Sequence, residues 1–311
     1  MTMRSRRQLR LTSFLVSILV LVLGIPIVTF PVAAQATPID CTAYSTPIAA
    51  GSPIATPDSA PPTNATPVAF PAGGGKLMVF AAASLTESFN AMKDRLEATN
   101  PGLEITYNFA GSQALVTQLT EGSPADVFAS ANGSQMQAAQ EAGVLAGAPV
   151  DFAQNSLAVI VPKENPAGIA TYADLGKPGI KLVVAQADVP VGNFARQSVC
   201  KAALDTTTYG DDFVAGVRAN IVSEEDNVKA VASKVALGEA DAGIVYITDI
   251  TSEIVDQVQV IEIQASVNVV ATYPIAPVRD GNAELAAAFI AYVTGPEGQA
   301  ILQESGFQPV R

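Results

Sequence analysis

Two serines, Ser84 and Ser112, stand where a predicted strand runs into a predicted helix. The strand at 77–81 leads through three alanines to Ser84, and the strand at 104–109 leads through an alanine and a glycine to Ser112. Small residues let a ligand approach the backbone, and a helix start presents N–H groups that have no partner within the helix. Ordinary N-capping would also explain both serines, and Ser84 with Glu87 matches a capping box. At the carboxyl edge of an open α/β sheet, we expect two such corners to hold an anion.

Two further helix starts and one tyrosine extend this candidate site. In residues 188–194 the chain turns through proline and glycine into a predicted helix. Residues 223–228 predict another helix with an acidic first turn, whose carboxylates would interact with the positive end of the helix dipole. The predicted strand that ends near Tyr246 could turn the tyrosine hydroxyl toward the ligand, although a half-buried strand tyrosine more often only packs.

Composition excludes much of the chemistry that other arrangements of residues could perform. The 311 residues include no histidine and only two cysteines, Cys41 and Cys200. A Ser-His-Asp triad, histidine zinc sites, four-cysteine zinc sites and iron–sulfur clusters are therefore impossible. The formal net charge of −12 makes nucleic acid a poor partner. Carboxylate chemistry, cofactor chemistry without histidine, or binding without catalysis remain.

One motif raises the alternative of an exported Ser/Lys hydrolase. Ser198 and Lys201 have the SxxK spacing of such enzymes, but the sequence contains neither an SDN nor a KTG triplet. The match also lies inside a predicted helix. We therefore rank hydrolysis below binding.

Predicted strands and helices alternate along the chain that carries these residues. Strands are predicted at 77–81, 104–109, 126–129, 157–161, 181–185, 243–247, 258–263 and 267–272. Helices are predicted from about residue 85 and after Gly111, Asn132, Gly192, Glu225, Asn282 and Pro296. This alternation predicts a parallel-rich α/β sheet. About 235 residues are large for one open sheet, so two α/β lobes are expected.

The N-terminus predicts export. Four arginines precede an apolar stretch at 11–23, and a small-residue cleavage site follows at 34–36. Residues 1–36 are therefore either a signal peptide or a retained N-terminal membrane anchor. Residues 37–75 are rich in Pro, Thr and Ala and contain no Lys or Arg, which indicates a disordered linker. Cys41 falls in this linker, and the sequence supports no disulfide between it and Cys200, although one is possible.

Several motifs resemble the molybdate-binding proteins of ABC importers, in order and with family-like spacing. They are AAASLT at 81–86, FAGS at 109–112, GSPADVF at 122–128, DVPVG at 188–192, EADAGIVY at 239–246 and GPEGQAIL at 295–302. The likeness runs from about residue 76 to the C-terminus. It implies a two-lobed periplasmic-binding-protein fold of type II, with an oxyanion held in a cleft between the lobes. Lobe one would comprise 76–154 plus 270–311 and lobe two 155–269, with crossings near 155–156 and 272–274.

The resemblance also implies which groups contact the ligand. They would be the hydroxyl and amide groups of Ser84 and Ser112, the backbone amides of Val191 and Val228, and the hydroxyl of Tyr246. Val191 replaces an alanine that is common in the family, which matters little because the contact is a backbone N–H. No direct protein ligand to molybdenum and no cofactor are expected. Neutral donors can hold a dianion without Lys or Arg.

The resulting hypothesis is a binding protein and not an enzyme. It would bind molybdate, and tungstate as well, outside the cytoplasm and deliver it to the permease of an ABC importer by hinge closure. We expect a monomer in the periplasm or on the outer face of the cytoplasmic membrane. Binding of another oxyanion, sulfate or phosphate, on the same fold is the alternative that composition alone does not exclude. The preference between molybdate and tungstate, the cleavage point and the permease stay open.

Overall fold

A computed structural model describes residues 38–44 and 68–310 of the chain. The predicted signal or anchor at 1–36 lies outside these residues, as does the middle of the predicted linker. Within the described part, no helix combines the length and the apolar character that crossing a membrane requires.

Nine strands in the described residues form one continuous sheet with the order β2-β1-β3-β9-β4-β7-β5-β6, and β8 pairs with β4. The strands are β1 (Gly75–Ala82), β2 (Leu103–Ala110), β3 (Val127–Ala129), β4 (Val150–Pro162), β5 (Leu182–Ala185), β6 (Ile221–Glu225), β7 (Ala242–Tyr246), β8 (Val258–Glu262) and β9 (Val270–Pro277). The α-helices are α1 (Thr86–Thr99), α2 (Ser112–Thr120), α3 (Gly133–Glu141), α4 (Pro190–Ala202), α5 (Thr206–Tyr209), α6 (Phe213–Asn220), α7 (Val228–Ala236), α8 (Ala283–Thr294) and α9 (Pro296–Glu304). Short 3-10 helices are η1 (Cys41–Tyr44), η2 (Ala83–Leu85), η3 (Tyr172–Gly176) and η4 (Ile247–Asp249).

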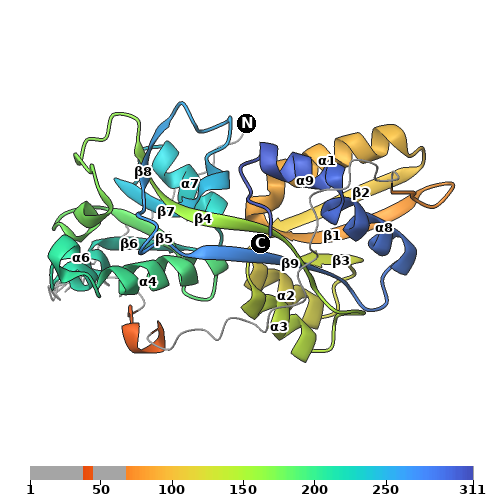
Figure 1. Cartoon of the computed structure of the whole chain (residues 1–311), viewed down its shortest axis with the longest axis horizontal. Coiled ribbons are helices and arrows are strands. Elements are labelled where there is room, and N and C mark those ends of the chain that lie inside the picture. Colours follow the sequence, from red (N-terminus) through yellow and green to blue (C-terminus); the bar gives the residue numbers. More distant parts are fainter. Residues whose placement is uncertain (1–37, 45–67, 311) are drawn as a thin grey trace, which may run out of the picture. The chain divides into compact units, whose positions relative to one another are not determined.

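Lobe one is the half of the sheet built on β2, β1, β3, β9 and the first part of β4. β1 lies between β2 and β3, parallel to both, and β3 pairs antiparallel with β9. Helices α1, α8 and α9 lie on one face of these strands, and α2 and α3 lie on the other (Figure 1). Adjacent strand residues point to opposite faces, so Val79 and Phe80 of β1 enter two different hydrophobic clusters.

Lobe two is built on β7, β5, β6, β8 and the last part of β4. β5 lies parallel to β6 and β7, and helices α4 and α7 both pack on β5 and β7. β4 connects the lobes because its pairing changes along its length: Ser156 pairs with Val270 of β9, whereas Leu157 pairs with Tyr246 of β7. Figure 1 shows β4 and β9 running between the two groups of strands.

The prediction of an acidic first helical turn at 223–228 was wrong. Residues 221–225 form β6, which pairs in parallel with β5, and the helix begins only at Val228. The two glutamates of β6 pair with cations. Glu224 pairs with Arg196, and Glu225 accepts a hydrogen bond from Lys234 Nζ at 2.6 Å. Charge at the start of a helix and charge at the end of a strand are indistinguishable in sequence when the strand is only five residues long.

The predicted linker packs onto the fold at both of its ends. Cys41 forms a disulfide with Cys200 of α4, with 5.3 Å between the two Cα atoms, and the turn η1 lies against α4. Ile39, Val68 and Phe70 are partly buried against the main hydrophobic cluster. The interpretation of residues 37–75 as a disordered linker therefore fails near Cys41, where a covalent bond compensates for the shortage of core-forming side chains.

Candidate functional site

Ser84 lies in η2, immediately beyond the carboxyl end of β1, and is 3% exposed. Its hydroxyl caps neither η2 nor α1, whose N-cap is Leu85. The capping box with Glu87 is therefore wrong, since the Glu87 carboxylate binds Lys229 Nζ at 2.7 and 2.8 Å. The Ser84 hydroxyl instead lies 2.9 Å from the hydroxyl of Tyr273.

Ser112 is the first residue of α2 and is 1% exposed. The N-cap is Gly111, and no side chain caps this helix. Ser112 Oγ accepts a hydrogen bond from the backbone N–H of Ala131 at 3.0 Å. Because the Ala131 N–H can only donate, the proton of the Ser112 hydroxyl stays available for another acceptor.

Val191 lies in the first turn of α4, directly after Pro190. No side chain caps this helix, and proline has no N–H, so Val191 offers its first free backbone donor. Buried Arg196 donates to the carbonyls of Ala185 and Gly192, each at 2.9 Å, and thereby fixes the turn. Sequence reasoning overlooked Arg196, which reads as an ordinary charged helix residue.

Val228 is the first residue of α7 and is buried. The side chain of its N-cap, Asn227, accepts from Ala230 N at 3.0 Å, two residues further along the helix. The N–H of Val228 therefore stays outside this cap. As at α2 and α4, a first-turn N–H group and the positive end of the helix dipole are directed beyond the N-terminal end of the helix.

Tyr246 ends β7 and is 1% exposed. Its hydroxyl makes no hydrogen bond of normal geometry within the described residues. Burial, together with the nearby Tyr273 and Asp249, raises the pKa of Tyr246 well above its ordinary value, so the group is a neutral donor. A buried hydroxyl without a partner costs about 1 to 3 kcal/mol, which an oxyanion oxygen would offset.

Asp249, which sequence reasoning did not single out, lies three residues after this tyrosine, in η4. Its Oδ2 accepts from the backbone N–H of Tyr246 at 3.0 Å, and its Oδ1 lies 4.0 Å from Lys229 Nζ. Burial raises the pKa of Asp249 to about 7, although Lys229 and the Tyr246 N–H act in the opposite direction.

Contacts between the lobes bring the predicted residues toward one another. Gln113, next to Ser112, donates to the carbonyl of Asp226 at 2.9 Å, next to the start of α7. Gln135 of α3 donates to the carbonyl of Asp188 at 3.1 Å, just before α4. The turn η2, which carries Ser84, lies against α7. The start of α7 therefore lies close to the start of α2 and to the turn η2, and the residues that lead into α4 lie close to α3.

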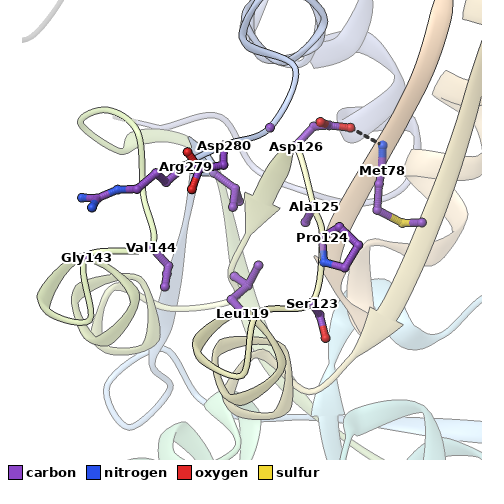
Figure 2. A pocket seen from close by; sticks show the side chains of 13 residues that line it. Met78, Leu119, Ser123, Pro124, Ala125, Asp126, Gly143, Val144, Arg279 and Asp280 are labelled. Carbon is purple, nitrogen blue, oxygen red and sulfur yellow. Dashed lines mark hydrogen bonds between the residues drawn. The ribbon is translucent and has the colours of Figure 1, made fainter.

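A pocket elsewhere on lobe one does not involve any of these residues. It is lined by Met78, Leu119, Pro124, Val144, Arg279 and their neighbours (Figure 2). Asp126 lies directly before β3 and beside Met78 in the middle of β1, whereas ligands of such sheets bind beyond the carboxyl ends of the strands. The Asp126 carboxylate accepts from the backbone N–H groups of Met78 and Asn282, both at 2.6 Å, which gives this aspartate a structural role.

The SxxK match forms no nucleophilic site. Ser198 is fully buried in α4, and its Oγ accepts a hydrogen bond from the Tyr172 hydroxyl at 3.0 Å. Lys201 Nζ donates instead to the carbonyl of Asn268 at 2.6 Å.

Comparison with known proteins defines the class. Residues 77–308 match the family of bacterial extracellular solute-binding proteins, and the chain belongs to this family. The two-lobed, type II periplasmic-binding-protein fold predicted from the sequence is confirmed. This is a family of solute-binding proteins and not of enzymes.

Individual relatives are more specific. The chain is 40% identical over 236 residues to the molybdate-binding protein ModA of Mycobacterium tuberculosis, covering 76% of this chain and 85% of that protein. The periplasmic molybdate-binding protein of Azotobacter vinelandii superposes with a TM-score of 0.63 at 18% identity, covering 76% of this chain and 100% of that one. The sulfate-binding protein SubI of M. tuberculosis superposes with a TM-score of 0.67 at 17% identity, covering 76% and 87%. Both superpositions establish the fold alone.

Proposed function

We propose that this protein binds molybdate, and tungstate as well, outside the cytoplasm and delivers it to the permease of an ABC importer. The 40% identity to a protein named for molybdate binding supports this ligand. Membership of an extracellular family supports the location. The protein itself catalyses no reaction in this proposal.

The observation that carries the proposal is the set of unused neutral donors at the junction of the lobes. The hydroxyl of Tyr246 is buried and makes no hydrogen bond of normal geometry within the described residues, and that of Ser112 accepts a hydrogen bond and keeps its proton. The first-turn amides of Val191 and Val228 add backbone donors. With Ser84, these groups would surround an ion that only accepts hydrogen bonds. A fully deprotonated tetrahedral dianion has this property.

Closure of the lobes would enclose the ion. In our proposal lobe one comprises 76–154 plus 270–311 and lobe two comprises 155–269, so that the chain crosses between them on β4 and near the start of β9. The bridges from Gln113 to Asp226 and from Gln135 to Asp188 then join opposite lobes. Such contacts would stabilise the closed state and break on hinge opening.

Size would set the selectivity. Sulfate, molybdate and tungstate share charge and geometry, so fixed donors can distinguish them only by the radius at which the oxygens meet the donors. A site spaced for the larger ions would leave sulfate too far from some donors, at about 1 to 3 kcal/mol for each unpaired group. The sulfate-binding protein on the same fold makes this the decisive comparison.

A thermal-shift and calorimetric screen tests the proposal. Ligand at about 100 times its dissociation constant adds about 2.7 kcal/mol of stability, so micromolar molybdate and tungstate should raise the melting temperature by several degrees. Millimolar sulfate and phosphate should not.

Tyr246→Phe keeps the ring and removes the hydroxyl, so it should weaken molybdate binding without loss of stability. Equal stabilisation by sulfate would refute the molybdate assignment, and a Tyr246→Phe variant with full affinity would remove this tyrosine from the site.

We propose that residues 1–36 direct export, as a cleaved signal or as a retained anchor, and that the mature protein acts as a monomer. The protein would work in the periplasm or on the outer face of the cytoplasmic membrane. The buried position of Ser198 supports the absence of Ser/Lys hydrolysis.

A further inference from the structure

The hydroxyl of Ser84 belongs to a buried hydrogen-bond chain that sequence reasoning did not predict. Ser84 Oγ lies 2.9 Å from the hydroxyl of Tyr273 on β9, and Asn155 Nδ2 on β4 lies 3.3 Å from the same hydroxyl. Asn155 Nδ2 also donates to Thr248 Oγ1 at 2.8 Å. All four residues are buried, and the chain runs from lobe one, across the two central strands, to η4 of lobe two. The distance between Ser84 and Tyr273 does not by itself say which hydroxyl donates.

The orientation of the Asn155 amide resolves this ambiguity. Its Oδ1 accepts from the backbone N–H of Ser156 at 2.9 Å. Because a backbone N–H can only donate, the amide oxygen must face Ser156, and the NH₂ group must face Tyr273 and Thr248. The Tyr273 oxygen is therefore an acceptor in its contact with Asn155.

The proton of Tyr273 then needs an acceptor of its own. Burial raises the pKa of Tyr273 above its ordinary value, so the group keeps this proton. Among the hydrogen bonds of normal geometry in the described residues, Ser84 Oγ is the acceptor within reach, at 2.9 Å, since the neighbouring Tyr246 hydroxyl makes none. If Ser84 donated instead, the Tyr273 proton would be buried without a partner, which is costly. Ser84 consequently accepts from Tyr273, and its own proton is directed elsewhere.

We propose that Tyr273 and Asn155 are positioning residues that make the Ser84 hydroxyl a hydrogen-bond donor to the bound oxyanion. Ser112 is held in the same state by the backbone N–H of Ala131. Both serine hydroxyls can then only donate a hydrogen bond to the ligand. This favours an ion whose oxygens all accept hydrogen bonds over an ion that carries a proton, such as hydrogen phosphate. The inference rests on the proposed oxyanion function and adds two residues that do not touch the ligand.

A double-mutant cycle tests the proposal, with molybdate titrated by calorimetry into the whole protein. Tyr273→Phe removes the hydroxyl but keeps the ring that packs on Phe152, Tyr246 and Phe307. We expect this change to weaken molybdate binding about tenfold in the wild-type background, as the loss of one oriented hydrogen bond would. In a Ser84→Ala background it should cost less than about twofold, because the hydroxyl that Tyr273 orients is already gone.

Tyr172→Phe is the matched control. Tyr172 is also buried and its hydroxyl also donates to a buried serine, Ser198, at 3.0 Å, but Ser198 lies seven positions along α4 from Val191, about 10 Å along the helix axis. The Tyr172→Phe variant should lower the melting temperature as Tyr273→Phe does and leave molybdate affinity unchanged. Equal losses of affinity from Tyr273→Phe in both backgrounds, or no loss in either, would show that Tyr273 only packs.

Failure of this inference can be told apart from failure of the proposed function. Binding of molybdate by the wild type is measured first, and its absence overturns the proposed function and the inference with it. If the wild type binds molybdate but Ser84→Ala binds it equally well, the positioning role is overturned while the oxyanion function stands. Circular dichroism of each variant confirms that the fold is retained.

Discussion

At the scale of single residues, the site depends on where protons are held. Tyr246 and Tyr273 stay protonated because burial raises the pKa of each hydroxyl, and their rings lie edge to face with centroids 5.8 Å apart. Asp249, which accepts from the backbone N–H of Tyr246, is the one carboxylate among the described residues whose pKa burial raises to about 7. A group that titrates so near neutral pH should affect stability under ordinary conditions.

Asp249→Asn should remove a pH-dependent loss of stability. The carboxyl has a pKa near 3.8 in the unfolded chain and about 7 in the fold, so between these values the folded state binds more protons. Its contribution is therefore most favourable below about pH 4 and is lost as the pH rises through 7. Asparagine keeps an acceptor for the Tyr246 N–H and carries no charge to bury. Urea unfolding from pH 4 to 8 should show the variant gaining stability over the wild type as the pH rises. Parallel stability curves would mean that the attraction of Lys229 fully offsets burial of the Asp249 charge, since Glu87 acts in the same direction as burial.

At the scale of elements, the helix starts matter because the backbones of opposite lobes approach closely there. A Cβ atom added at Gly111 would lie 2.5 Å from the carbonyl oxygen of Asp226. Backbone cannot yield as a flexible side chain can, so only glycine permits this approach at the N-cap of α2. Any residue can adopt the φ of −60° that Gly111 has. Glycine is therefore required here for the space that a side chain would fill and not for its backbone conformation.

Gly111→Ala should therefore hinder closure while leaving each lobe folded. We expect molybdate affinity to fall at least about tenfold, because the added methyl group separates α2 from the start of α7. Gly133→Ala is the control, since Gly133 also lies at a helix start and its added Cβ would meet no atom within 4 Å. Calorimetry gives the affinities, and small-angle scattering with saturating molybdate would show a larger radius of gyration for Gly111→Ala alone. Wild-type affinity in Gly111→Ala would mean that binding does not require this approach.

The elements also show what sequence could and could not predict. The strands at 77–81 and 104–109 and the helices behind them were predicted because apolar residues recur with a clear period and small residues mark the corners. β6 was missed because its last residues are acidic and pair with cations from α4 and α7, which are tertiary contacts. The positions of Ser84 and Ser112 followed from the corners, but the chain through Tyr273 and Asn155 could not, because 118 residues separate these two.

At the scale of the whole molecule, the disulfide changes how the N-terminal segment joins the fold. Cys41 lies near the start of the described residues and is joined by the disulfide to Cys200 of α4. The first strand of lobe one, β1, begins only at Gly75. The bond thus fastens residues outside the α/β pattern to lobe two. An oxidising compartment is where such a bond persists, in agreement with membership of an extracellular family.

Removing this bond should lower stability but not affinity. It closes a loop with a sequence separation of 159, and loops of this order stabilise a fold by about 2 to 5 kcal/mol through the restricted unfolded chain. A Cys41→Ser, Cys200→Ser double variant should therefore melt on the order of 10 °C lower. Molybdate binding should persist, because Cys200 lies nine positions along α4 from Val191, about 13 Å away along the helix.

Reduction provides the control for this last variant. Dithiothreitol should lower the melting temperature of the wild type to that of the double variant and leave the double variant unchanged. If the double variant instead loses molybdate affinity at a temperature at which it is fully folded, the disulfide acts on the site through α4 and the turn that Arg196 holds. If the double variant melts as the wild type does, the packing of Ile39 and the neighbouring turn on the fold is sufficient without the covalent link.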